Sequence, residues 1–110
     1  MAQPRFTDLS SERQSFIRRC QRLGFGTLRG LEVHDCEPVF GLKTEVLVDL
    51  KLDTDATPRP EQELGDFILR DEILRLFALL DDLRNGVIEQ VEVRAGIPRR
   101  IMFRETRPQP

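Results

Sequence analysis

The sequence contains no tryptophan and no tyrosine, and its only aromatic residues are seven phenylalanines. Proteins that bind single-stranded nucleic acids commonly stack bases on exposed aromatic side chains, so this class has little support. The chain has one histidine, His34, on which any histidine-based metal site or nucleophile would depend. We therefore predict a protein that is not an enzyme, with no catalytic, cofactor-binding or metal-binding residues.

The chain is also poor in cysteine and has no long apolar run. Cys20 and Cys36 are too few for a disulfide scaffold, and we expect free thiols. No apolar stretch approaches the ~20 residues that a membrane-spanning helix needs, which argues against a membrane partner. Residues 1–16 carry no hydrophobic signal core, so we expect a cytoplasmic protein. The length predicts a single domain over residues 1–110.

Charge is nearly balanced overall but segregated along the chain. Residues 1–34 and 83–110 each carry a net charge of +3, whereas residues 35–82 carry −8. This segregation favours association through complementary charge, with a second copy or with another protein. The basic ends also contain the residues that we predict as contacts for a partner or for nucleic-acid phosphates. These are Arg94, Arg99, Arg100 and Arg104 on one hairpin, with Arg18, Arg19 and Arg22 on the first helix.

Residues 23–40 resemble residues 83–100 when the two segments are aligned without gaps. Five positions are identical: Leu23, Gly26, Glu32, Val33 and Pro38 recur as Leu83, Gly86, Glu92, Val93 and Pro98. An apolar spacing typical of one helix face precedes both segments. Each copy is therefore predicted to be an amphipathic helix followed by a β-hairpin.

The first helix is expected to begin at Ser11, with Gln14 completing a capping box, and to end at Gly24. The second should begin near Asp71 and end at Asn85-Gly86.

In the strand that follows the second helix, Val87, Val91 and Val93 are predicted to share one face. Ala95-Gly96 should form the hairpin turn. "KTEVLVDLKLD", residues 43–53, alternates apolar and polar side chains and gives the strongest strand signal in the chain.

One helix and one hairpin cannot bury their own apolar faces, but two copies can cover each other. We therefore predict an α+β fold of two helix–hairpin repeats related by pseudo-two-fold symmetry. The mostly antiparallel sheet should contain about five strands, with both helices on one face. Repeat one spans about residues 10–52, an acidic, proline-containing linker about 53–66, and repeat two about 67–105.

The stretches "GTLRGLEVHDCEPV" and "GVIEQVEVRAGIPR" resemble a motif of small uncharacterised bacterial proteins. In that family, a helix precedes a G-x-[IV]-x-x-[LIV]-x-[VI]-x-[DN]-G-x-[PV] hairpin. The resemblance covers about half of the chain and implies a fold, with no activity and no site residues to carry over. Cys36 replaces the motif's glycine, and positive φ is costly without glycine. We therefore favour an altered first turn over the alternative, a redox role for the Cys36 thiol.

Three hypotheses for function follow. The first is a non-enzymatic module for protein–protein interaction or dimerisation through exposed strand edges. The second is a nucleic-acid-binding regulator that uses the arginine-rich hairpin. The third is a small-molecule pocket between the repeats. Glu32 and Glu92 could form a carboxylate pair, but pairing with arginines such as Arg94 and Arg100 is the favoured interpretation.

Overall fold

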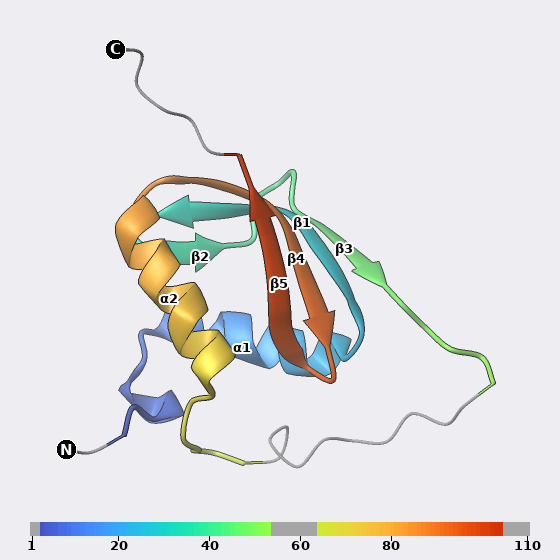
Figure 1. Cartoon of the computed structure of the whole chain (residues 1–110), viewed down its shortest axis with the longest axis horizontal. Helices are drawn as coiled ribbons and strands as arrows, with labels where there is room; N and C mark the ends of the chain where they lie inside the picture. The colour runs from blue at the N-terminus through green and yellow to red at the C-terminus, as the bar shows by residue number, and fades with distance from the viewer. Residues whose placement is uncertain (1–2, 54–63, 105–110) are drawn as a thin grey trace.

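The computed structural model describes residues 3–53 and 64–104, which form an α+β fold (Figure 1). Its elements in chain order are η1 (Phe6–Asp8), α1 (Ser11–Leu23), β1 (Gly26–His34), β2 (Glu37–Val39), β3 (Glu45–Val48), α2 (Asp71–Leu83), β4 (Gly86–Arg94) and β5 (Ile97–Phe103). The predicted class and the two helices are confirmed. Most of the predicted linker, residues 54–63, lies outside the described residues.

The five strands form one antiparallel sheet, as predicted. Its order is β2-β1-β4-β5, and β3 also pairs with β1. β3 lies beside the first half of β1, and β2 lies beside the second half. The partner changes at Gly30, which adopts a positive φ of 69°. An added β-carbon there would lie 3.1 Å from the Lys43 carbonyl oxygen. The close approach of this backbone segment, together with the positive φ, therefore favours glycine at position 30.

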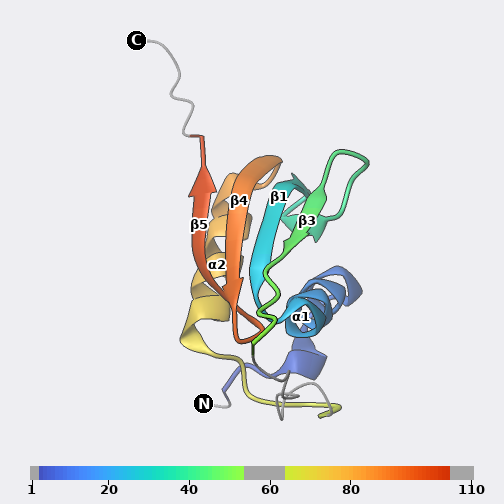
Figure 2. The ribbon, with the colours of Figure 1, turned by 90° about the vertical axis from the view of Figure 1, so that its right-hand side faces the viewer.

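The core lies between one face of the sheet and the two helices. A single cluster of buried side chains joins Phe16, Ile17 and Cys20 of α1 with four residues of α2 and the inward residues of β1 and β4. Both helices therefore cover the same face of the sheet, as Figure 2 also shows. No other layer of the described residues covers the opposite face.

The prediction that Val87 shares one face with Val91 and Val93 is wrong. Val87 is exposed, whereas Ile88, Val91 and Val93 are buried. The ladder between β4 and β5 shifts register between Ile88 and Gln90. Such a bulge inserts one residue into the strand and reverses the alternation of inward and outward side chains beyond it. Before the bulge, Ile88 therefore points inward and Val87 points outward.

Both helices begin where the sequence predicted, but the capping details differ. Ser10, rather than Ser11, is the N-cap, and its hydroxyl accepts the Arg13 N–H at 3.3 Å. The Gln14 amide donates to the Leu9 carbonyl at 3.0 Å and closes no capping box. At the other end of α2, the cap is Arg84, one residue before the predicted Asn85-Gly86.

The first hairpin turn is a second correction. Asp35 and Cys36 have φ of 50° and 68°, close to the 53° and 77° of Ala95 and Gly96 in the second turn. The two turns therefore share one backbone form, typical of type I′. Cys36 adopts positive φ without the freedom of glycine, contrary to the predicted altered turn.

None of the helices in residues 3–53 and 64–104 has the length and apolar character that a membrane crossing needs.

Candidate functional site

Strand β3 forms one edge of the sheet. Figure 2 shows the strands in the order β5, β4, β1 and β3 from left to right, and none of the described strands lies beyond β3. The sequence predicted a strand over residues 43–53, but β3 ends at Val48, which pairs with Gly26 at the start of β1. One more bond follows, from the Asp49 N–H to the Phe25 carbonyl at 2.8 Å. The strand stops because its partner stops.

The apolar side chains of this segment remain in solvent. Val48 is 65% exposed, Leu50 is 69% exposed and Leu52 is 91% exposed. Phe25, beside Asp49 at the start of β1, is also exposed. Exposed apolar side chains that gather on one segment make it a candidate association surface. We refer to residues 43–53 as the β3 edge.

The backbone of the β3 edge is also open to a partner. The Asp49 N–H donates toward β1, and backbone groups alternate in direction along a strand. The N–H and C=O groups of Val46 and Val48 therefore point away from β1. Such a row of outward groups is a template for another strand.

The other outer strands carry features that block strand addition. β5 contains Pro98, which lacks an N–H, and shifts register between Glu92 and Val93 of its partner. β2 is three residues long and contains Pro38. Proline and bulges both protect sheet edges from pairing. Among the described strands, β3 alone has an outer edge free of both.

The predicted hairpin arginines contact nearby carboxylates. Three ion pairs are present: Arg94 with Glu92 at 2.6 Å, Arg99 with Glu72 at 2.7 Å, and Arg104 with Glu89 at 3.0 Å. Arg100 lies opposite Glu92 in the ladder. Their positive charge is thus locally offset. The favoured pairing of Glu92 with an arginine is present.

The predicted arginines of α1 lie in a different place. Arg18 stacks over the Phe6 ring at 4.3 Å and donates to the Gln21 side-chain oxygen at 2.9 Å. Arg19 lies over the Phe40 ring at 5.8 Å. Arg22 and Arg18 line an open hollow beside η1. The seven arginines therefore do not form one basic surface.

The thiols and the histidine form no nucleophilic pair. His34 contacts Glu32 at 2.8 Å, whereas the Cys36 thiol donates to the Asp81 carbonyl at 3.7 Å. Burial raises the pKa of the Cys20 thiol to about 12, which keeps it protonated. Nowhere in the described part of the chain do three side chains of the usual metal-ligating types gather.

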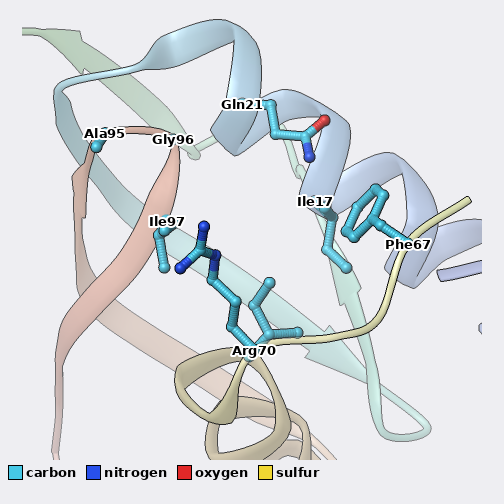
Figure 3. A pocket seen from close by; sticks show the side chains of 8 residues that line it. Ile17, Gln21, Phe67, Arg70, Ala95, Gly96 and Ile97 are labelled. Carbon is cyan, nitrogen blue, oxygen red and sulfur yellow. The ribbon is translucent and has the colours of Figure 1, made fainter. Parts of the chain in front are cut away.

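A pocket lies between α1, the start of α2 and the β4–β5 turn (Figure 3). Gln21 and Arg70 point into it from the two sides, with Ile97 of β5 at its wall. Its volume is about 20 Å³. This is room for about one water molecule, whereas small-molecule sites commonly reach hundreds of Å³.

The β3 edge was not among the predicted site residues, although its strand pattern was recognised. The available signal was the run of apolar side chains in residues 43–53, which continues past Val48 through Leu50 and Leu52. A scan against family models and searches of curated proteins and of solved structures find no match to this chain.

Proposed function

We propose that this protein is a non-enzymatic association module that binds through the β3 edge. The observation that carries the proposal is the coincidence of outward backbone groups with exposed Val48, Leu50 and Leu52. Burial of each such side chain contributes about 1.5–3 kcal/mol, and strand addition supplies backbone hydrogen bonds as well.

We also infer that the chain is a fused pair of helix–hairpin units related by a pseudo-two-fold axis. The support is a constant offset of sixty residues between α1 and α2 and between β1 and β4. The ladder between β1 and β4 agrees, because Gly26 lies opposite Val93 and Val33 lies opposite Gly86. Exchange of the two copies maps this register onto itself, as a two-fold axis requires.

Nucleic-acid binding has weaker support. Three of the four hairpin arginines contact carboxylates, and those of α1 lie on a separate element. Phosphate binding would have to compete with these ion pairs.

Replacement Val48→Pro tests the association. Proline removes the N–H that points away from β1 and leaves the bond from Asp49 to Phe25 in place. We expect the full-length protein to self-associate at micromolar concentration and the variant to be monomeric. Sedimentation velocity measures the association, and circular dichroism checks that the variant is folded.

The matched control is Val48→Thr, which keeps both the backbone N–H and the β-branched shape. We expect it to associate, with an affinity reduced by less than tenfold. A wild-type chain that neither self-associates nor binds another protein through this edge, or a folded Val48→Pro variant that associates like wild type, would contradict the proposal.

A further inference from the structure

We propose that the partner of the β3 edge is a second copy of this chain, paired antiparallel about a two-fold axis at Val48. This inference rests on the proposed function, because it names the occupant and the register of the same edge. In this register, a residue numbered i lies opposite residue 96 − i of the other copy. One sheet then runs through both molecules.

The direction of the backbone groups fits this pairing. Val46 and Val48 point their N–H and C=O groups away from β1, because the Asp49 N–H bonds to Phe25 on the β1 side. Val48 of one copy and Val48 of the other then form a hydrogen-bonded pair on the axis. Val46 and Leu50 form the next hydrogen-bonded pair on each side, which extends β3 beyond its present end.

The two-fold axis also keeps the helices of both copies on the same face of the joined sheet. An antiparallel pair with its axis perpendicular to the sheet puts equivalent faces on the same side. The helices of both copies therefore cover one common face. On that face, the exposed side chains of Val48 and Leu50 meet Val48 and Val46 of the other copy, which removes them from water.

Charge selects this register. Directly opposed residues of opposite charge stabilise a sheet, and like charges destabilise it. With Val48 on the axis, Glu45 lies opposite Lys51. This pair occurs twice, because the interface is symmetric.

The two adjacent registers that keep the faces aligned bring like charges together. With Leu47 on the axis, Glu45 lies opposite Asp49. With Asp49 on the axis, Asp49 lies opposite Asp49 of the other copy. Repulsion therefore disfavours both neighbours, and the complementary register identifies a second copy as the partner.

Charge reversal tests the register. Glu45→Lys places two lysines opposite each other, and Lys51→Glu places two glutamates opposite each other. We expect each single variant to raise the dimer dissociation constant about tenfold or more, from two repulsive contacts per dimer. The double variant Glu45→Lys/Lys51→Glu restores the opposite charges and should regain wild-type affinity. Sedimentation velocity and native mass spectrometry measure these affinities.

Mixing the two single variants gives a sharper measurement. In the heterodimer, the unchanged Lys51 of one variant faces the unchanged Glu45 of the other, and the two substituted side chains face each other with opposite charges. Both contacts are attractive only if the register is correct, so the mixture should dimerise at concentrations at which each variant alone is mostly monomeric. Mass labelling of one variant distinguishes heterodimers from homodimers.

Two outcomes would overturn parts of this inference. If Val48→Pro is monomeric but the mixture of charge variants does not dimerise, the proposed register is wrong. Association through the β3 edge would still be supported. A monomeric wild type that binds another protein through this edge would overturn the second-copy assignment alone.

Discussion

Four residues other than glycine adopt positive φ in the described chain, and all lie in the tight connections. They are Asp35, Cys36, Arg84 and Ala95. Arg84 is the most demanding, with φ 64° and ψ −59° at the end of α2. The Asn85 N–H bonds to the Leu83 carbonyl at 2.7 Å across it, which closes a three-residue γ-turn. This form of the γ-turn is rare and strained for residues with a β-carbon.

The equivalent position after α1 is Gly24, with nearly the same backbone angles, φ 75° and ψ −72°. Its neighbours form the same turn, since the Phe25 N–H bonds to the Leu23 carbonyl at 2.8 Å. Glycine adopts this conformation without strain, because it has no β-carbon that could clash. The two ends of equivalent helices thus differ in strain through a single residue.

Arg84→Gly should therefore stabilise the protein. Relief of backbone strain contributes about 1–3 kcal/mol, and the greater freedom of glycine in the unfolded chain offsets about 0.5–1 kcal/mol. We expect a net gain of about 1 kcal/mol in the free energy of unfolding, measured by urea denaturation. The exposed Arg84 side chain contributes little to this balance.

Arg84→Ala is the control, because it removes the same side chain and keeps the β-carbon. Its unfolding free energy should stay within about 0.5 kcal/mol of wild type. An equal gain in both variants would assign the effect to the arginine side chain and contradict the strain argument.

At the scale of elements, the attachment of β3 depends on Gly26. A β-carbon at this position would lie 2.2 Å from the Leu47 carbonyl oxygen and 2.9 Å from the Leu23 side chain. The Leu47 carbonyl belongs to the backbone of β3 and cannot move aside as a flexible side chain can. Any residue larger than glycine at position 26 therefore displaces β3 from β1. Gly86 stands at the position that aligns with Gly26, but at Gly26 it is the close approach of β3 that requires glycine.

Gly26→Ala should loosen β3 without unfolding the core. We expect a loss of about 1–3 kcal/mol in unfolding free energy from the steric overlap. Hydrogen exchange of the Asp49 amide, which bonds to Phe25, should accelerate more than that of amides in β4. Gly65→Ala is the control, because no heavy atom lies within 4 Å of its added β-carbon. Unchanged exchange at Asp49 would show that the sheet absorbs the added methyl group elsewhere.

Local signals in the sequence sufficed for most elements. Apolar spacing located the start of α1 at Ser11 and of α2 at Asp71, although the predicted capping box does not form, and Ala95-Gly96 marked the second turn. Local signals failed where distant partners decide the outcome. Val87 faces outward because the ladder with β5 is bulged, and β3 stops at Val48 because β1 begins at Gly26. Neither partner can be read from the neighbouring residues.

The candidate site could be predicted only in part. The alternating apolar pattern of residues 43–53 was visible, but exposure of Leu50 and Leu52 depends on what the rest of the fold leaves uncovered. The arginines were prominent by charge, yet partners such as Glu72 for Arg99 lie on other elements. The count of arginines in the sequence therefore overestimates the positive charge that is left for binding a partner.

At the scale of the whole molecule, each half of the chain caps the other. The Cys36 N–H in the first hairpin turn donates to the carbonyl of Arg84 at 2.7 Å, at the end of α2. The Gly96 N–H in the second turn donates to the carbonyl of Gly24 at 2.8 Å, at the end of α1. These bonds satisfy helix-end carbonyls that lack partners within their own helix.

Arg13 adds a further link between the halves. Its guanidinium donates to the Cys36 carbonyl at 3.0 Å and to the Asp81 carboxylate at 2.6 Å, and it stacks 4.7 Å from the Phe77 ring. The side chain is largely buried, so its charge needs these partners. One residue of α1 thereby contacts the first turn and α2 together.

These reciprocal contacts predict that the chain can be divided and reassembled. A break between residues 58 and 59 leaves every contact described above intact, whereas either fragment alone exposes its half of the core. We expect fragments 1–58 and 59–110 to be unfolded separately and to form a folded one-to-one complex when mixed. Circular dichroism follows the recovery of structure, and titration calorimetry gives the affinity.

Ile88→Asp in the second fragment should abolish reassembly. Ile88 is fully buried opposite Leu31 in the central ladder, where an unpaired charge is costly. A first fragment that folds alone would instead show that its helix and strands can form a core without the second helix and hairpin.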